Sequence, residues 1–272
     1  IALYDMAMKM GAPVIGLIDC SGLRLQEGTD ALQAFGTIYA KQALASGVIP
    51  QISAVFGGCG GGLAVIPGLT DFTFLEASGG KVFVNSPNAI PGNEISKCDT
   101  SSPEFQSEST GLIDETGTEE EILAQIRTLI CMLPCNNEED VSYEECTDDL
   151  NRPCAQIESG TEDTAIALMD LSDSGIFFET KRHFARDMVT GFVKLNGMTV
   201  GAVANRSKVY NDQAEVEAEF DGSLSADGAS KAAAFVEFCD AFNIPIVTFE
   251  DMPGYLPGVE QEYMGVIRHG AK

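Results

Sequence analysis

Glycine occupies five of the six positions from Gly57 to Gly62, directly after a run of apolar residues. Glycine has no Cβ, so a bound molecule can approach this backbone closely. If the turn opens a helix, its free N–H groups point at that molecule with the positive end of the helix dipole behind them. Such a turn can bind a phosphate or stabilise an oxyanion. Close packing of a helix against a strand is the alternative role for these glycines.

The glycine run lacks the other features of nucleotide-binding loops. Its spacing does not fit the dinucleotide fingerprint, and no Lys-Ser or Lys-Thr pair follows it, as a phosphate loop of the ATPase type requires. There is no Gly-x-Ser-x-Gly elbow, and His183 and His269 have no evident catalytic partners. Backbone N–H groups are therefore the best candidates for the chemistry. This favours stabilisation of an enolate or a related anion next to a thioester.

An internal repeat surrounds this region. The segment Pro13 to Gly22, PVIGLIDCSG, aligns with Pro245 to Gly254, PIVTFEDMPG. Each copy follows the end of an amphipathic helix pattern and runs through an apolar strand to an aspartate, Asp19 or Asp251. Chance similarity between two buried strands is the alternative. The shared order of helix, proline, strand, aspartate and turn favours a duplication.

Helix and strand patterns alternate around these motifs. Helices are predicted over 1–10, 29–46, 119–133, 164–173 and 225–242, with a last one beginning near Glu260. Strands are predicted over 14–19, 49–56, 71–76, 81–85, 176–180, 188–195, 199–204 and 245–250. This alternation predicts an α/β fold with parallel strands. The acidic stretch 135–163 is interpreted as an exposed linker.

Composition excludes several classes of partner. The net charge is −25, with 41 acidic against 16 basic residues, which argues against nucleic acid or an anionic membrane surface. It leaves room for a small anion held by local groups. No run is long and apolar enough to span a bilayer. We expect the eight cysteines to be reduced, as in a cytoplasmic protein, several of them in apolar settings: Cys20, Cys59, Cys131 and Cys239.

Three stretches carry a family resemblance: DCSGLRLQEG (19–28), ALASGVIPQISAVFGGCGGG (43–62) and FCDAFNIPIVTFEDMPGYLPGVEQEYMGVIRHGAK (238–272). They resemble biotin-dependent acyl-CoA carboxyltransferases, especially those of methylmalonyl-CoA and glutaconyl-CoA decarboxylases and of propionyl-CoA and acetyl-CoA carboxylases. The resemblance covers roughly 1–90 and 165–272. It implies a crotonase-like (ClpP/crotonase) fold with two homologous ββα-type lobes, both incomplete in this chain. The implied divisions are an acyl-CoA lobe over 1–133, a linker over 134–163 and the start of a carboxybiotin lobe over 164–272.

The resemblance also implies site residues. The backbone N–H groups of Gly61 and Gly62 would form an oxyanion hole for the thioester oxygen, with Gly22, Leu23, Arg24 and Gly60 contacting the substrate. The loop after the second repeat would shape the biotin side, although a rigid turn is an equally good account of it: Pro253, Gly254, Tyr255, Leu256, Pro257 and Gly258. No metal is expected.

Partners are implied in the same way. Biotin would be carried by a biotin carboxyl carrier protein or domain, and acyl-CoA would be the substrate. The chain would form a homo-oligomer built from dimers, with active sites between subunits. A membrane partner is expected if the parent enzyme is a decarboxylase of the membrane-bound kind.

Two departures from the family pattern leave alternatives open. Ser21 and Leu23 stand where the family has glycine and alanine, which adds bulk near the acyl group. The repeat predicts a second oxyanion hole beyond Lys272, so this chain alone is not expected to be a complete catalyst. One alternative is a crotonase-type hydratase, isomerase or hydrolase with Glu27 as acid or base. The other is a degenerate, non-catalytic scaffold of a carboxylase complex.

Overall fold

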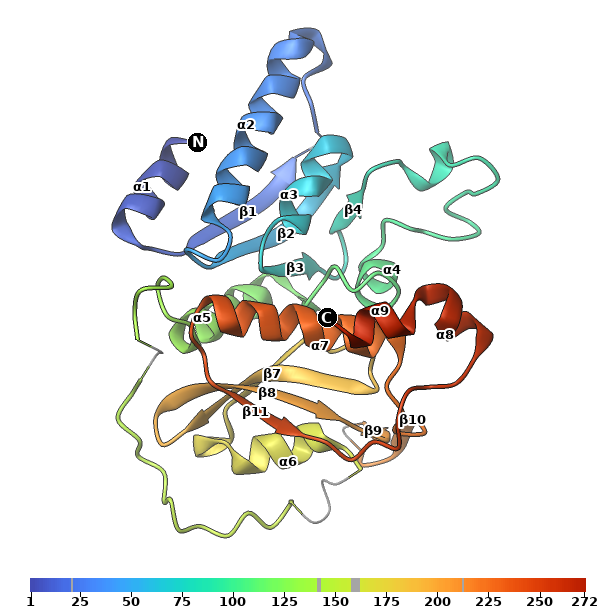
Figure 1. The fold of residues 1–272 in the computed structure, drawn as a ribbon. Helices are drawn as coiled ribbons and strands as arrows, with labels where there is room; N and C mark the ends of the chain where they lie inside the picture. The colour runs from blue at the N-terminus through green and yellow to red at the C-terminus, as the bar shows by residue number, and fades with distance from the viewer. Residues whose placement is uncertain (21, 141–142, 158–161, 212) are drawn as a thin grey trace. The chain divides into compact units, whose positions relative to one another are not determined.

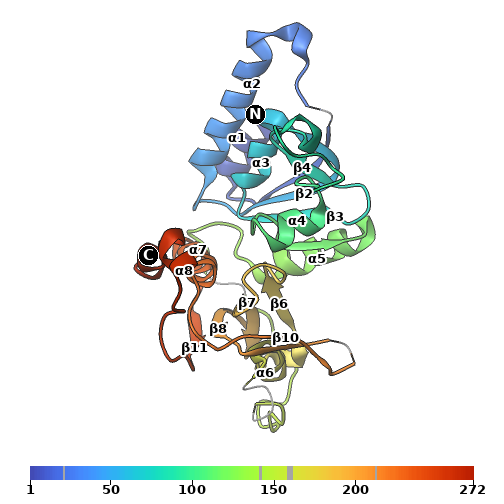
Figure 2. The ribbon, with the colours of Figure 1, turned by 90° about the vertical axis from the view of Figure 1, so that its right-hand side faces the viewer.

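The computed structural model describes residues 1–20, 22–140, 143–157, 162–211 and 213–272. Ser21, one of the two departures from the family pattern, lies outside them. The chain divides into two compact units, Ile1–Glu139 and Asp140–Lys272 (Figures 1 and 2). The division falls within the segment predicted to be a linker, and the lobe bounds proposed above stay a prediction.

The first unit contains a parallel five-stranded sheet. Its strands lie in the order β1 (Val14–Cys20), β2 (Gln51–Gly60), β3 (Phe72–Glu76) and β5 (Glu115–Gly117), and β4 (Lys81–Phe83) pairs with the end of β2. The helices α1 (Ala2–Met10), α2 (Thr29–Ala45) and α3 (Val65–Gly68) gather on one side of the sheet in Figure 1. On the other side lies α5 (Glu119–Met132), and α4 (Pro103–Glu108) follows β4.

Local sequence explains why α5 forms and which face it buries. Thr118 and Glu121 make a capping box that satisfies two backbone N–H groups at the helix start. Ile122, Ile126 and Leu129 recur at intervals of three and four residues, and all are buried. This stripe packs against β2 and β3, which are themselves buried because they are central strands of the sheet.

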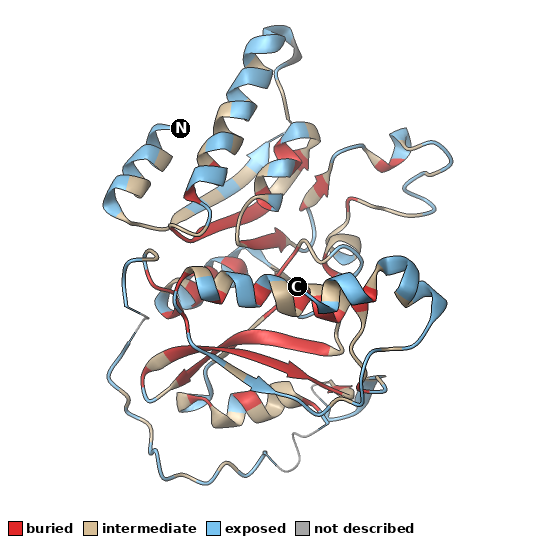
Figure 3. Cartoon of the chain, viewed as in Figure 1, coloured by how far each residue is buried: buried red, intermediate tan, exposed pale blue. Residues whose placement is uncertain are grey.

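The second unit contains a four-stranded mixed sheet. The strand order is β11 (Ile246–Phe249), β8 (Met198–Asn205), β7 (Met188–Leu195) and β6 (Phe177–Thr180). In Figure 1 this sheet lies between α6 (Thr164–Leu171) and α7 (Ala226–Ala241), and Figure 3 shows β7 and β8 largely buried. A short hairpin of β9 (Lys208–Tyr210) and β10 (Val216–Glu219) and the helices α8 (Val259–Met264) and α9 (Val266–Gly270) complete the unit.

The prediction of parallel strands is confirmed for the first unit and is wrong for most of the second. There β6, β7 and β8 are antiparallel neighbours, and only β11 runs parallel to β8. The reason is the two-residue connection Asn196-Gly197 between β7 and β8. Both residues have positive φ angles, 52° and 79°, as a tight hairpin turn requires.

The repeated segments form corresponding strands, β1 and β11. Each lies at the edge of its sheet among the described strands, but their neighbours differ. The partner of β1 is β2, which follows it in the chain, whereas the partner of β11 is β8, which precedes it. The internal repeat therefore stays a prediction, since the sheets around the two strands differ. No described helix is long and apolar enough to cross a membrane.

Candidate active site

The glycine run forms the end of β2 and the 3-10 turn η2 (Gly61–Ala64) that follows it. Gly61 has a φ of +64°, in the left-handed region that side chains rarely adopt. A Cβ at Gly60 would lie 2.9 Å from the ring of Phe83, and one at Gly62 would lie 3.1 Å from the Tyr39 hydroxyl oxygen. Glycine is therefore favoured at three successive positions, once for conformation and twice for space.

Tyr39 of α2 holds this turn from one side. Its hydroxyl donates a hydrogen bond to the carbonyl oxygen of Gly62, which also accepts the backbone N–H of Val65. Burial raises the pKa of the Tyr39 phenol, with a smaller contribution from Cys59, so the group stays a neutral donor. The ring of Phe35 stacks on Tyr39 with centroids 6.0 Å apart. The peptide after Gly62 is thus fixed by a side chain and by the turn itself.

The loop after β1, which contains Gly22, lies against the glycine turn. Gly22 has a φ of +105°, and a Cβ there would lie 3.5 Å from the carbonyl oxygen of Gly60. A Cβ at Gly57 would lie only 2.1 Å from a carboxylate oxygen of Asp19. The two glycine positions let the ends of β1 and β2 approach closely. The structure therefore brings the predicted residues Gly22 and Gly60 together.

A hollow of about 180 Å³ opens between this loop and α2. Gly22, Leu23, Arg24 and Glu27 line it from the loop, and Phe35 lines it from the helix. Arg24 and Glu27 form an ion pair at 3.3 Å, with exposed fractions of 82 % and 53 %. An ion pair that is this exposed to solvent contributes little to stability. A bound ligand could therefore displace it at little cost and contact either side chain.

The predicted biotin-side loop follows β11 in the second unit. The side-chain amide of Asn205 donates to the carbonyl of Asp251 and accepts its N–H, both at 2.8 Å. Leu224 donates its N–H to Gly254 and accepts the N–H of Leu256, both at 2.9 Å. These hydrogen bonds hold Asp251, Gly254 and Leu256, at the start and in the middle of the loop.

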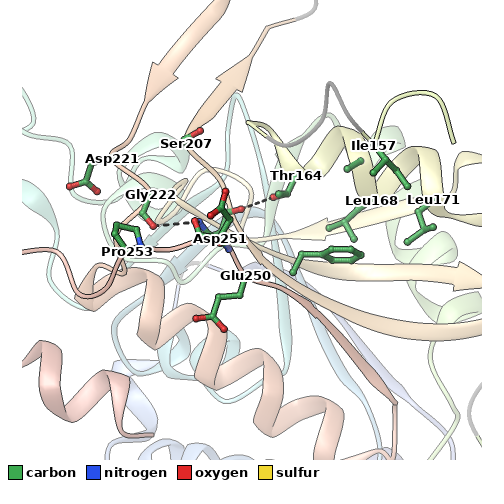
Figure 4. A pocket seen from close by; sticks show the side chains of 13 residues that line it. Ile157, Thr164, Leu168, Leu171, Ser207, Asp221, Gly222, Glu250, Asp251 and Pro253 are labelled. Carbon is green, nitrogen blue, oxygen red and sulfur yellow. Dashed lines mark hydrogen bonds between the residues drawn. The ribbon is translucent and has the colours of Figure 1, made fainter.

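One side of this loop faces a pocket of about 440 Å³ (Figure 4). Pro253 contributes to its wall, and Leu168, Leu171 and Phe249 supply apolar surface. Its charged lining residues are the acids Asp221, Glu250 and Asp251. An apolar, acid-bordered pocket suits an uncharged group better than an anion.

Sequence reasoning missed the residues that hold these loops. Tyr39 lies within the helix predicted over 29–46, and Asn205 directly follows the strand predicted over 199–204; neither is among the predicted site residues. The role of these two residues could have been inferred only if the sequence had shown that their polar side chains face the predicted turns. Among the residues that the structure describes, no three His, Cys, Asp or Glu side chains gather as metal ligands.

Comparison with known proteins defines the class. Residues 1–272 match the family model described as the carboxyl transferase domain, and the chain belongs to this family. The match extends through the connecting segment, where the sequence resemblance was loose. A solved structure, described below, also confirms the expected crotonase-like α/β carboxyltransferase fold.

Named relatives make the class more specific. The chain is 40 % identical to the carboxyltransferase subunit of propionyl-CoA carboxylase from Haloferax mediterranei, covering 99 % of this chain and 52 % of that one. It is 37 % identical to methylmalonyl-CoA decarboxylase subunit alpha from Veillonella parvula, covering 100 % and 54 %. The chain therefore spans about half the length of these relatives.

A solved structure shows the same fold. The transcarboxylase 12S hexamer, with hydrolysed methylmalonyl-coenzyme A bound, superposes with a TM-score of 0.90 at 32 % identity. The alignment covers 99 % of this chain and 52 % of that one.

Proposed function

We propose that the chain is part of the carboxyltransferase component of a biotin-dependent acyl-CoA carboxylase or decarboxylase. The main observation behind this proposal is the glycine turn at Gly60–Gly62, which Tyr39 holds by a hydrogen bond and which the loop of Gly22 approaches closely. Backbone N–H groups of Gly61 and Gly62 would donate to the thioester oxygen of a bound acyl-CoA. Such preorganised donors stabilise the negative charge that develops on that oxygen.

In the decarboxylating direction, one carboxyl group would move from the acyl-CoA to biotin. The bond between the α-carbon and its carboxyl group breaks, and its electron pair remains as the enolate held by the glycine turn. The carboxyl carbon becomes bonded to a ring nitrogen of biotin, and the proton of that nitrogen ends on the α-carbon. With a glutaconyl substrate the same steps apply at the γ-carbon. Carboxylation is the reverse.

The residues fit these ligands in different ways. The glycine turn offers backbone space where side chains would intrude, as a thioester group requires. Leu23 and Arg24 line the adjoining hollow and would contact the acyl-CoA. When bound, biotin supplies the carboxyl acceptor or donor. The loop from Pro253 to Gly258 would form one wall for it, and the neighbouring apolar pocket suits an uncharged ring.

The partners follow from the same proposal. A biotin carboxyl carrier protein or domain would deliver biotin, and the full-length chain would assemble into an oligomer built from dimers. In each site the acyl-CoA lobe of one subunit would face the carboxybiotin lobe of its partner. We place the enzyme in the cytoplasm, with a membrane partner only if it works as a membrane-linked decarboxylase.

The test uses the full-length parent protein. It is incubated with free biotin and malonyl-, methylmalonyl- or glutaconyl-CoA, and loss of the acyl carboxylate is followed. Biotin-dependent loss with one of them supports the transfer reaction and identifies its acyl group. No loss with any of them, from a folded oligomer, overturns the proposal.

A second candidate is a crotonase-type hydratase, isomerase or hydrolase. The observation that favours it is Glu27, a carboxylate in the same hollow as Gly22. An acid or base at this position would be essential to such chemistry, whereas carboxyl transfer does not require it. Glu27→Gln should therefore abolish hydratase, isomerase or hydrolase activity and leave most carboxyl transfer intact.

A further inference from the structure

Two cysteines face each other across the strands that lead into the glycine turn. Cys20 is the last residue of β1, and its partner in the parallel register is Cys59 of β2. Neighbouring strands lie roughly 4.8 Å apart. Disulfides join Cα atoms that are about 4.4–6.8 Å apart, so the register meets the first requirement for a bond.

The side chains also share a face of the sheet. Ile18, two residues before Cys20 on β1, packs against the core cluster that contains Cys59. The register between β1 and β2 shifts between Ile18 and Cys20, and Cys20 is then paired with Cys59. Residues paired on neighbouring strands point to the same face of the sheet. Burial raises the pKa of the Cys59 thiol to about 12, and the Cys20 thiol adds to the rise.

Cys20 and Cys59 differ in their exposure to solvent. Of the four cysteines in apolar sequence settings, Cys59 and Cys239 are buried, whereas Cys20 and Cys131 are exposed. Cys20 is exposed because it lies at the open end of β1, where the loop to α2 begins. An oxidant can therefore reach Cys20 first, and Cys59 is paired with Cys20 on the neighbouring strand.

We propose that Cys20 and Cys59 form a reversible disulfide when the protein meets a peroxide. Hydrogen peroxide takes two electrons from the Cys20 thiolate, which becomes a sulfenic acid, and hydroxide leaves. The Cys59 sulfur then bonds to the Cys20 sulfur, and water leaves with the sulfenic oxygen and the Cys59 proton. The net reaction converts two thiols and one peroxide into a disulfide and two waters. A dithiol reductant reverses it.

The bond would act on the candidate site directly. Cys20 lies two residues before Gly22, and Cys59 lies two residues before Gly61. A disulfide ties together the two segments that must adjust around an acyl group. Oxidation should therefore slow carboxyl transfer, and this consequence, unlike the bond itself, rests on the proposed function.

The test treats the full-length protein with a small excess of hydrogen peroxide, blocks free thiols and digests it with trypsin without reduction. Cleavage after lysine and arginine gives peptides 10–24 and 42–81, each with a single cysteine. Mass spectrometry should find these two peptides linked, and dithiothreitol should release them. Cys20→Ser should abolish the link, whereas Cys135→Ser, at another exposed cysteine, should leave it unchanged.

Activity is measured in parallel. Wild type and Cys135→Ser should lose at least half of their transfer rate on oxidation and recover it with dithiothreitol, while Cys20→Ser should keep its rate. Peptides that stay unlinked while Cys20 is oxidised to a sulfinic or sulfonic acid would overturn the inference. A linked pair in an enzyme that transfers no carboxyl group even when reduced would uphold the disulfide and reject the proposed function.

Discussion

The hydroxyl of Tyr39 donates a hydrogen bond to the carbonyl oxygen of Gly62, which lies 23 residues further along the chain. The bond ties the middle of α2 to the turn that carries the candidate oxyanion hole. A peptide plane held at its carbonyl cannot rotate freely. This plane carries the N–H of Leu63, so the bond restrains the turn immediately after the proposed donors, Gly61 and Gly62. Such preorganisation is what makes backbone donors effective in catalysis.

Tyr39→Phe tests this relationship by removing only the hydroxyl. A lost hydrogen bond costs about 0.5–1.5 kcal/mol, so kcat should fall roughly two- to tenfold. KM for acyl-CoA should change little, because the hollow keeps its shape. Steady-state kinetics of the full-length enzyme measure this, with Tyr143→Phe at an exposed tyrosine as the control. An unchanged kcat would show that the bond does not position the turn.

Gly62→Ala tests the space beside Tyr39. The added Cβ would lie 3.1 Å from the Tyr39 oxygen, so the turn or the tyrosine must shift. A small displacement of catalytic groups can lower kcat roughly 100-fold. Gly36→Ala is the matched control, because its Cβ meets nothing within 4 Å and it lies inside α2. That control should keep its activity and gain up to about 1 kcal/mol of stability. Equal activity in the two variants would contradict the assignment.

Leu23→Ala tests whether Leu23 limits the acyl group. The side chain lines the hollow beside the turn, and the smaller residue enlarges it. A difference of one methylene group between two substrates changes their relative transition-state free energy by about 1–3 kcal/mol in an apolar pocket. The kcat/KM ratio of methylmalonyl-CoA over malonyl-CoA should rise roughly tenfold. Leu32→Ala, at an exposed leucine of α2, should leave the ratio unchanged. A ratio that does not respond to Leu23→Ala would place the acyl group elsewhere.

Asp71 makes the stability of the chain depend on pH. Its carboxylate accepts the backbone N–H of Gln51 at 2.7 Å, but burial raises its pKa to about 7, and Asp114 adds to the rise. Because the folded pKa lies above the unfolded value, the contribution of Asp71 is fully present below about pH 4 and is lost as pH rises through about 7.

Asp71→Asn should remove this dependence while keeping an oxygen for Gln51. Urea unfolding should show the variant about 1–3 kcal/mol more stable than wild type at pH 8, and close to it at pH 4. Asp240→Asn, at an exposed carboxylate, serves as the control. A variant that is less stable than wild type at pH 8 would show that the carboxylate is needed in its charged form.

The sequence predicted most long elements because their apolar patterns are long enough to distinguish. The strand from Val14 and the helices from Thr29 and Ala226 begin within one residue of the predicted positions. Three short strands were missed: β5, β9 and β10. Each has three or four residues, several of them polar or charged, and each forms because a neighbouring strand offers backbone partners.

The candidate site was predictable only in part. The glycine run and the resemblance around it located Gly60, Gly61 and Gly62, because glycine marks positions where a side chain does not fit. The contacts of Tyr39 with Gly62 and of Asn205 with Asp251 depend on tertiary packing between distant segments. The pairing of Cys20 with Cys59 depends on strand register, which the apolar pattern of two buried strands does not fix.

The most direct test of the proposed carboxyl transfer follows the carboxyl group itself. Full-length enzyme would be incubated with free biotin and acyl-CoA labelled with carbon-13 in its free carboxyl group, using the acyl-CoA selected above. Rapid quenching at alkaline pH and mass spectrometry would then identify the labelled product. Carboxyl transfer should give labelled carboxybiotin and an equal amount of decarboxylated acyl-CoA, both strongly reduced in Gly62→Ala. Label that stays on hydrated, isomerised or hydrolysed acyl product, with none on biotin, would contradict it.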